Sequence, residues 1–418
     1  MTGRTPTTRT EPTAPTSDPP TALARCVGDA DQFLAHRFTV EPHAWSGSGF
    51  DDLLSLADVD RALTGAGLRR PAVRVVRDGD LIDPWTWTRP TRTGSMRIDD
   101  HVHPGRVLAL FAEGATVVLQ SLQRWWPPLT RFCRSLELEL GHPVQTNAYL
   151  TPPGAAGLSP HHDTHDVFVL QVHGRKQWFV REPLIEAPLV RHRSDHDRAA
   201  AQPVLFEAEL RPGDCLYLPR GYIHSATTQA GASLHLTVGV LARTVHDVLR
   251  RLVERAAGEP VFRQSLPPGY VTSPDIAARA VKEAVAEFMR WLERQDTAEV
   301  AGELRDRFWT SRPPALGGQL LELVSLDAID DNTVIVRRDG ISCELETADA
   351  RLRITLGDRR LDLPEVLGDA VYRLVDGAPH EVRDLDDLLD GSSRMVLVRR
   401  LVREGLLRTS GDPAARRD

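Results

Sequence analysis

Residues 145–237 carry the pattern of a segment built from short β-strands. Runs of β-branched and aromatic residues alternate there with Gly, Pro and Asp. Residues 167–172 and 177–180 flank a His-Gly turn, and residues 215–218 lie between two Pro- and Gly-containing groups. Many short strands separated by such turns are typical of a β-sandwich or barrel.

Helical spacing appears on both sides of this segment. Before it, residues 99–112 and 129–140 place apolar side chains on one face. After it, residues 244–257 predict one helix, and Ser273-Pro274 combines an N-cap with a first-turn proline at the start of another. The apolar stripe of this second helix predicts a face that packs on a core or on a partner subunit. The stripe comprises Val281, Val285, Phe288 and Leu292.

The last hundred residues mix both patterns. Residues 333–336 and 341–345 flank an Asp-Gly turn, which predicts a β-hairpin. Alternating apolar residues at 352–356 predict a third strand, and residues 385–389 and 394–403 predict two short helices. This order is compatible with a winged-helix module.

The length of 418 residues predicts two or three domains. Residues 1–21 are rich in Thr and Pro and lack an apolar core, so we expect a disordered tail and not a signal peptide or membrane anchor. We place domain boundaries so that a β-rich catalytic domain covers 22–242, a helical region 243–312 and a C-terminal domain 313–418, with Arg312-Pro313-Pro314 as the linker. No apolar stretch approaches transmembrane length, so we expect no membrane partner.

Charge and cysteine content narrow the class of protein. The net charge of -7 means that the chain as a whole lacks the positive charge that favours binding to nucleic acid. The last predicted helix is basic, but acidic residues surround it, so we interpret it as a solvated face and expect no nucleic-acid partner. The four cysteines are far apart, which argues against disulfides or a zinc ribbon and favours a reducing cytoplasm. The basic residues are Arg394, Arg399, Arg400 and Arg403.

A candidate metal site begins at Pro160-His161-His162-Asp163. In an extended chain residues i and i+2 share a face, so His161 and Asp163 both point into a barrel while His162 points away. His224 ends a Gly-Asp…Pro…Gly strand pattern later in the β-rich segment. Two histidines and one carboxylate are the facial triad of non-haem iron(II) oxygenases, which keeps three metal positions open. The helical HExxH spacing of many zinc hydrolases is absent.

Other clusters of ligand-type residues compete with this triad. An isolated His-x-Asp occurs often by chance, so the alternative is a group of surface histidines; the downstream His224 favours the metal site. Residues 99–103 also contain Asp and His, and we interpret them as a polar turn before a helix. His165-Asp166 forms another His-Asp pair. Its candidate roles are a neighbour of the metal ligands, a substrate contact or an alternative source of a metal ligand.

Four motifs resemble the ribosomal oxygenase branch of the JmjC/cupin family of 2-oxoglutarate oxygenases. The match is dense from residue 145 to 238 and weaker through the later helices. Together the motifs are specific for the family, but they do not encode the substrate. They are NAYLTPPG at 147–154, HHD at 161–163, FVLQVHGRKQW at 168–178 and GDCLYLPRGYIH at 213–224.

The resemblance implies a fold: a double-stranded β-helix (cupin, jelly-roll) core, a helical dimerisation region and a C-terminal winged-helix-like domain, assembled as a homodimer. It also implies iron(II) at the triad and 2-oxoglutarate as co-substrate. Lys176 matches the basic residue that pairs with the far carboxylate of 2-oxoglutarate, and a lysine on a barrel strand is costly to bury unless an anion meets it. The alternative places Arg175 inward and Lys176 in a solvated turn.

Further pocket residues follow from the same motifs. Asn147 matches a family residue whose amide donates near the metal-bound end of the co-substrate, although an Asn that satisfies strand-end backbone groups is an equal alternative. Tyr149, Thr237 and His235 are candidates to line the pocket or to pack in the barrel. We interpret Gln171 and Trp178 as structural.

The family resemblance implies hydroxylation of a protein side chain, with Arg or His of a ribosomal protein as the candidate target. N-demethylation, which is hydroxylation of an N-methyl group followed by collapse, stays open. One alternative is a hydroxylase of a small molecule or peptide natural product. A second is a non-catalytic metal-binding cupin that acts as a sensor or binding module, against which the complete triad and Lys176 argue.

Overall fold

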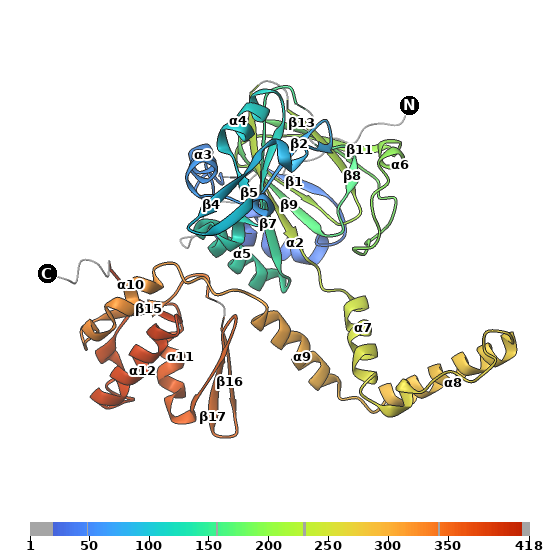
Figure 1. Ribbon diagram of the computed structural model, residues 1–418. Helices are drawn as coiled ribbons and strands as arrows, with labels where there is room; N and C mark the ends of the chain where they lie inside the picture. Colours follow the sequence, from blue (N-terminus) through green and yellow to red (C-terminus); the bar gives the residue numbers. More distant parts are fainter. Residues whose placement is uncertain (1–19, 48, 156–157, 229–230, 342, 412–418) are drawn as a thin grey trace.

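The computed structural model describes residues 20–47, 49–155, 158–228, 231–341 and 343–411 (Figure 1). The predicted disordered tail therefore lies almost entirely outside the described residues. None of the described helices is long and apolar enough to cross a membrane.

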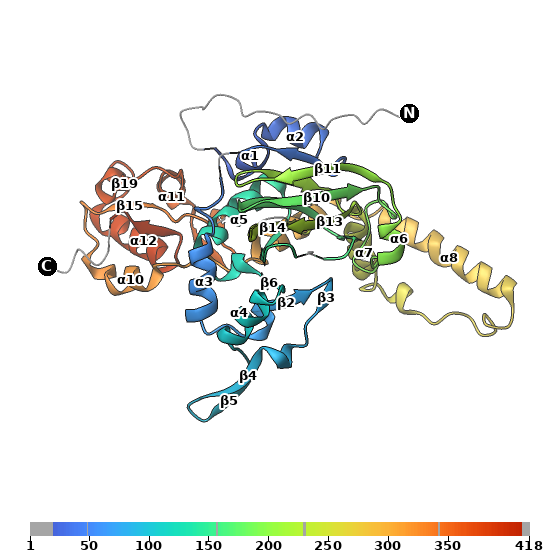
Figure 2. The ribbon, with the colours of Figure 1, turned by 90° about the horizontal axis from the view of Figure 1, so that it is seen from above.

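Two antiparallel β-sheets lie face to face in the N-terminal part of the chain (Figure 2). The larger sheet has the strand order β1 (His43–Trp45), β12 (Cys215–Leu218), β9 (Asp166–His173), β14 (Ser233–Val240), β7 (Val144–Thr151), β6 (Thr116–Leu119), β2 (Val73–Arg77) and β3 (Asp80–Leu81). The smaller has the order β11 (Val204–Leu210), β10 (Lys176–Arg181), β13 (Ile223–Thr228) and β8 (His161–His162).

Strand β9 explains why the two sheets pack in this way. Its residues alternate between two hydrophobic cores because successive side chains point to opposite faces. Val167 and Val169 pack between the sheets, whereas Phe168 and Leu170 pack on the helices behind the larger sheet. These covering helices are α1 (Ala22–Val27), α2 (Ala30–His36), α3 (Leu56–Gly65), α4 (Pro104–Ala112) and α5 (Pro127–Leu140); α6 (His196–Ala200) follows β10. A strand that is buried on both faces has a continuous run of apolar residues, and β9 has this pattern.

One predicted helix begins later than its pattern suggested. Residues 96–102 form β5 (Met96–Val102), which pairs with β4 (Thr88–Thr93) in a projecting hairpin, and α4 starts only at Pro104 (Figure 2). The interpretation of residues 99–103 as a polar turn was therefore wrong, because they extend a strand up to His103, which caps α4. Their polar character suggested a turn. In a two-stranded ribbon, however, both faces are largely exposed to solvent, so a strand there can be as polar as a turn.

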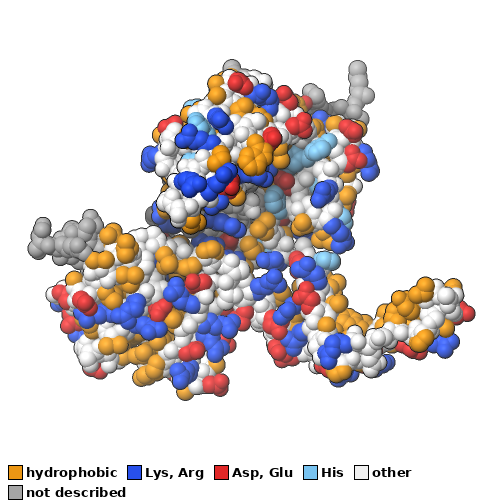
Figure 3. Space-filling model, viewed as in Figure 1, with side chains coloured by type: hydrophobic (Ala, Val, Ile, Leu, Met, Phe, Trp, Pro, Cys, Tyr) orange, Lys and Arg blue, Asp and Glu red, His pale blue; other side chains and the backbone are white. Residues whose placement is uncertain are grey.

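Three helices form an arm that projects away from the sheets (Figure 1). They are α7 (Val245–Ala256), α8 (Pro274–Leu292) and α9 (Thr297–Thr310). Phe288 packs on Trp291 within the arm, with ring centroids 5.6 Å apart. Val281 and Val285 are 61% and 56% exposed, so the described part of the chain leaves that half of the predicted stripe largely uncovered. Figure 3 shows hydrophobic side chains gathered toward the end of the arm.

The C-terminal region has its own hydrophobic core. Its elements are α10 (Gln319–Val324), β15 (Val334–Arg337), β16 (Glu344–Ala348), β17 (Arg351–Thr355), β18 (Arg360–Pro364), α11 (Gly368–Leu374), β19 (His380–Glu381), α12 (Gly391–Arg403) and β20 (Leu407–Thr409). Short 3-10 turns connect many elements of the chain: η1 (Arg70–Ala72), η2 (Pro84–Thr86), η3 (Leu122–Arg124), η4 (Pro260–Arg263), η5 (Leu326–Ala328), η6 (Glu365–Leu367) and η7 (Val382–Leu385).

The hairpin predicted across Asp339-Gly340 was wrong. Strand β15 pairs with β19 and β20, whereas β16 pairs with β17 in a separate sheet. The Asp-Gly turn is present, but β15 forms its backbone hydrogen bonds with β19 and β20, which come later in the sequence. The predicted helix at 385–389 is only the end of η7 and a following turn, and α11 was not predicted.

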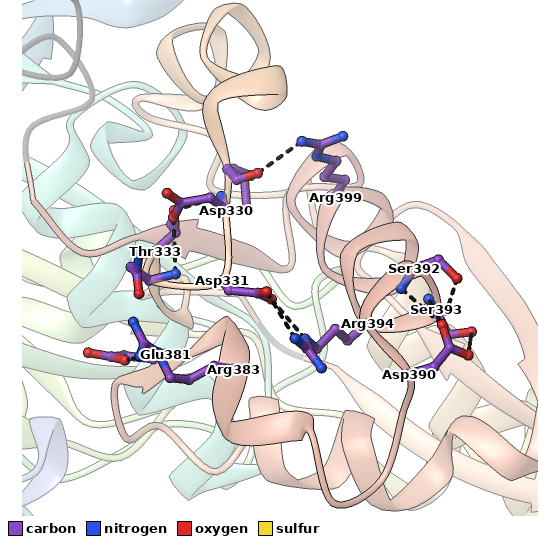
Figure 4. A network of polar contacts seen from close by, with 12 residues as sticks. Asp330, Asp331, Thr333, Glu381, Arg383, Asp390, Ser392, Ser393, Arg394 and Arg399 are labelled. Carbon is purple, nitrogen blue, oxygen red and sulfur yellow. Dashed lines mark hydrogen bonds and ion pairs between the residues drawn. The ribbon is translucent and has the colours of Figure 1, made fainter.

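The basic face of α12 is partly tied to its own domain. Arg394 donates from Nε and Nη2 to the two carboxylate oxygens of Asp331, at 2.8 and 2.9 Å (Figure 4). Arg399 donates to the backbone carbonyls of Asp327 and Ile329. Asp390 caps the start of the helix (Figure 4). The sequence pattern predicted a solvated face, whereas Arg394 and Arg399 are bound to residues of their own domain.

The predicted linker is held to the sheet domain by a buried ion pair. Arg312 Nε lies 2.8 Å from Glu137 Oε2 on α5, and Arg134 reaches the same carboxylate oxygen at 2.6 Å. Arg134 also donates to the carbonyl of Pro313. The segment is therefore a fixed joint between the C-terminal region and α5.

Candidate metal centre and active-site cavity

Strand pairing brings the predicted metal ligands together. Antiparallel pairing of β8 with β13 places His224 directly opposite His161. Asp163 follows β8, and its carbonyl accepts a hydrogen bond from the Gly221 amide. One ligand atom from each of the three side chains lies within 4.8 Å of the others, and Asp163 Oδ2 is 3.6 Å from His224 Nε2. Residues 61 positions apart in sequence thus share one site.

Backbone carbonyls set the orientation of both imidazoles. His161 Nδ1 lies 2.7 Å from the Ser159 carbonyl, and His224 Nδ1 lies 3.1 Å from the Tyr222 carbonyl. A carbonyl can only accept, so each Nδ1 carries the proton and each Nε2 presents a lone pair to the site. This arrangement fixes the tautomer and ring orientation that metal-ligating histidines need.

The electrostatics favour the metal-binding forms of these groups. Burial opposes ionisation of Asp163, but the neighbouring imidazoles, His224 foremost, hold its pKa below the usual value. Burial, followed by the effect of His161, lowers the pKa of His224 to about 4. The carboxylate is therefore charged and His224 neutral at physiological pH. Two imidazole nitrogens and one carboxylate on one side fit a divalent metal that keeps other coordination positions open.

The nearby histidines occupy different places. His162 points away from the triad, as predicted, and its Nε2 contacts the carbonyl of His192. His165 lines the cavity, with Nδ1 4.0 Å from Asp163 Oδ2. Gly239 leaves room for this ring, since a Cβ there would lie 3.0 Å from it. Asp166 is buried and accepts from the Arg220 amide, so it supports the backbone and stays out of the cavity.

A cavity of about 360 Å³ lies between the two sheets and contains the triad. Lys176 on β10 lines it and is only 3% exposed. Its Nζ donates to Thr151 Oγ1 at 3.0 Å, and burial lowers the pKa of Lys176 to about 7. Arg175 instead points to solvent and lies 3.6 Å from Glu209. The alternative that placed Arg175 inward was therefore wrong.

The remaining predicted pocket residues come from β7 and β14. Their register places Asn147 opposite Thr237 and Tyr149 opposite His235, and all four line the cavity. Asn147 Oδ1 accepts from the Ser121 amide at 3.0 Å, so its own amide group remains as a donor. Tyr149 stacks on His235 with ring centroids 5.0 Å apart.

Gln171 and Trp178 were both interpreted as structural. Gln171 has only a structural role, whereas Trp178 has a second one. Gln171 bonds Ser233 and two backbone carbonyls, whereas Trp178 also lines the cavity beside His235. Sequence reasoning missed Arg74, which lines the cavity from β2. The available signal was a cation in the middle of an apolar strand run, between Val73 and Val75.

Comparisons with known proteins bear on this site. The family model described as the JmjC domain matches residues 119–248, the segment that supplies every triad residue and Lys176. Residues 119–248 are a JmjC domain. The predicted family is thereby confirmed for this part of the chain, together with its β-rich cupin-type fold.

Curated relatives are similar to part of this chain. Ribosomal oxygenase 1 of Rattus norvegicus is 37% identical over 183 residues, which cover 40% of this chain and 30% of that protein. Ribosomal oxygenase 2 of Bos taurus is 30% identical over 274 residues, covering 62% and 56%. The bifunctional lysine-specific demethylase and histidyl-hydroxylase NO66 of Dictyostelium discoideum is 34% identical over 182 residues, covering 41% and 35%. The chain spans less than two thirds of the length of each relative.

Solved structures extend the likeness beyond the JmjC domain. The Escherichia coli ribosomal oxygenase YcfD has a TM-score of 0.53 at 16% identity, with 92% of this chain and 99% of that chain covered. A complex of YcfD with cobalt and 2-oxoglutarate gives 0.52 at 17% identity, with the same coverage. At such identity the likeness is one of fold, and its coverage extends beyond residues 119–248.

Proposed function

We propose that the chain is an iron(II)- and 2-oxoglutarate-dependent oxygenase that hydroxylates a protein side chain. The observation that carries the proposal is the triad of His161, Asp163 and His224 in one cavity with the buried Lys176. A metal triad alone is compatible with several chemistries. The added buried cation, which has no carboxylate partner among the described residues, calls for an anionic co-substrate.

The spacing between these groups suits a short dicarboxylate. Val180 lies opposite His224 in the sheet, and Lys176 lies four residues further along β10. Four residues of antiparallel strand span about 13 Å. A five-carbon dicarboxylate that chelates a metal at the triad reaches back toward an inward-pointing lysine side chain over that distance.

Each side chain has a role in this proposal. The triad holds iron(II) on one side, and Lys176 anchors the far carboxylate of 2-oxoglutarate. Asn147 donates its amide hydrogen near the metal-bound end, and Tyr149 and Thr237 form the adjoining wall. When bound, iron(II) and 2-oxoglutarate supply the oxidising chemistry, in which 2-oxoglutarate yields succinate and carbon dioxide and one oxygen atom of dioxygen enters a substrate C–H bond.

The substrate proposal rests on the names of the relatives. Ribosomal oxygenases and a histidyl-hydroxylase are similar to part of this chain, which supports a ribosomal protein as substrate, with Arg or His as the target. One relative is also named a lysine demethylase, so N-demethylation belongs to the same proposal as an outcome. Mass spectrometry of treated ribosomal proteins separates a gain of oxygen from a loss of methyl.

Anaerobic titration of iron(II) and 2-oxoglutarate into metal-free protein tests the proposal. A visible charge-transfer band is expected on chelation. The band should vanish in His161→Ala and require far more 2-oxoglutarate in Lys176→Ala, whereas His162→Ala, which faces away from the triad, is the matched control. Metal binding without any such band would favour a non-catalytic cupin. A band with turnover only on small molecules would favour the natural-product alternative.

We further propose that the arm carries a homodimer interface and that residues 313–418 are a winged-helix-like domain. Exposed apolar residues recur at i, i+4 and i+8 on two arm helices, which supports self-association because such stripes rarely stay uncovered. The stripe on α7 comprises Val245, Leu249 and Val253, and that on α8 comprises Val281, Val285 and Met289.

A further inference from the structure

The charges around the cavity are unevenly distributed. Arg74 and Lys176 are the cationic side chains among the described residues that line it, and Asp163 is the carboxylate. The triad assigns Asp163 to the metal, and Lys176 lies on the opposite sheet from Arg74. No described lining residue is therefore left to neutralise a positively charged guest.

Arg74 is poorly satisfied where it stands. It lies on β2 between the buried Val73 and Val75, opposite Val118 of β6. Its Nη2 donates to Tyr149 Oη at 3.4 Å, which is long for a hydrogen bond. Its Nε is buried without a hydrogen-bond partner among the described residues. A buried donor without an acceptor is costly, so this guanidinium is poised for a guest that accepts.

The side chains next to Arg74 also offer hydrogen-bond donors. Tyr149 Oη accepts from Arg74, which leaves the tyrosine proton free to be donated onward. Asn147 uses its oxygen to accept from the Ser121 amide, and its NH₂ group donates toward the Tyr149 hydroxyl. Arg74, Tyr149 and Asn147 lie on β2 and β7, strands of the same sheet. Together they form a donor array on the cavity wall.

We propose that this donor array selects a target side chain that is uncharged and accepts hydrogen bonds, such as an imidazole or carboxamide, and rejects a guanidinium or ammonium group. The inference rests on the proposed function and narrows its substrate class. A guanidinium group has five N–H donors and no acceptor. In this cavity it would face other donors and the positive charge of Arg74. Specificity arises here mainly by exclusion of the wrong charge.

A pair of matched probes isolates this effect. N-acetyl-citrullinamide and N-acetyl-argininamide have nearly the same shape, but citrulline is neutral and presents a carbonyl acceptor. Each is titrated anaerobically into the iron(II) and 2-oxoglutarate complex, and perturbation of the charge-transfer band gives a half-saturation concentration. Wild-type protein should bind citrulline roughly tenfold or more tightly than arginine. The readout is binding, independent of turnover.

Substitutions assign the preference to Arg74. Arg74→Gln should reduce the ratio to less than about threefold, and Arg74→Lys, which keeps the charge, should retain most of it. Arg77→Gln is the matched control, because Arg77 lies on the same strand but pairs with Glu113 outside the cavity. If Arg74→Gln fails to fold, the wild-type ratio still tests the selection.

Several outcomes would overturn the inference. Equal binding of the two probes, binding of neither, or an unchanged ratio in Arg74→Gln would each contradict it. Loss of 2-oxoglutarate affinity in Arg74→Gln as large as in Lys176→Ala would assign Arg74 to the co-substrate instead. Failure of the proposed function is distinguishable, since the charge-transfer band would then be absent before any probe is added.

Discussion

Lys176 Nζ donates a 3.0 Å hydrogen bond to Thr151 Oγ1 across the gap between the two sheets. Thr151 Oγ1 in turn lies 3.2 Å from Thr116 Oγ1, so the ammonium meets a neutral hydroxyl pair and no carboxylate of the described residues. A cation buried against neutral partners disfavours the folded state until an anion arrives. This relationship makes Lys176 a group whose contributions to stability and to binding have opposite signs.

Lys176→Met should therefore stabilise the ligand-free protein. Replacing a buried ion pair by apolar side chains of similar volume can add about 1–4 kcal/mol to the free energy of unfolding, and a gain of this order is expected for this buried ammonium. The same variant should lose measurable affinity for 2-oxoglutarate. Urea unfolding at pH 7 and titration of 2-oxoglutarate measure the two effects, and a destabilised variant would show that the ammonium is already compensated.

Stability should also rise with pH because of this residue. The unfolded chain keeps the lysine proton up to a pKa of about 10.4, whereas the folded protein releases it near pH 7. Unfolding then takes up a proton between these values, so the free energy of unfolding increases as pH rises from 7 toward 10. Urea midpoints across this window should increase for wild-type protein and increase less for Lys176→Met.

Affinity for 2-oxoglutarate should change in the opposite direction. The anion needs the charged ammonium, so its dissociation constant should increase above pH 7, by up to about tenfold per pH unit. Lys176→Arg is the control, because a guanidinium stays charged throughout and should give a flatter profile. Parallel profiles for the two proteins would place the titration on another group. Anaerobic titration at pH 7, 8 and 9 makes the measurement.

The joint at Glu137 should be essential to stability. Its carboxylate holds Arg134 and Arg312, and it also accepts from the Val144 amide at the start of β7. Glu137→Leu leaves two buried guanidinium groups without their anion and should cost about 3–5 kcal/mol. Ser135→Ala, an exposed position on the same helix, is the matched control. Urea unfolding followed by circular dichroism distinguishes the two, and equal stability would contradict the role of the joint.

The proposed dimer should depend on the exposed stripe of α8. Val285→Glu places a charge on a side chain that is 56% exposed in the single chain, so folding should be little affected while association weakens. Sedimentation equilibrium should then show a shift from dimer to monomer. Glu283→Gln, on the same helix but off the stripe, should remain dimeric. A wild-type protein that sediments as a monomer would refute the interface.

Local sequence pattern predicted the elements whose burial follows from their own periodicity. Strand β12 has the predicted bounds, and Ser273 caps α8 as expected. Errors arose where a partner distant in sequence competed for the backbone. The turn at Asp339-Gly340 predicted a hairpin, but β20, about seventy residues later, pairs with β15 instead.

For the site, the i and i+2 rule on an extended strand was sufficient to place His161 and Asp163 together and to turn His162 away. The strand-end motif was sufficient to nominate His224. What the sequence could not give is the tautomer of each imidazole, since that depends on the carbonyls of Ser159 and Tyr222. Arg74 shows the same limit, because its approach to Tyr149 exists only through the pairing of β2, β6 and β7.

The sequence by itself thus determined the β-rich core through short-range periodicity and the metal-ligand candidates through motif spacing, and its motifs carried the resemblance to the JmjC family. Only the tertiary structure decided which cations face the cavity, that neither has a carboxylate partner among the described residues, and which apolar stripe stays uncovered. Those properties depend on what is packed against a side chain, and the packing partners come from strands and helices far away in sequence.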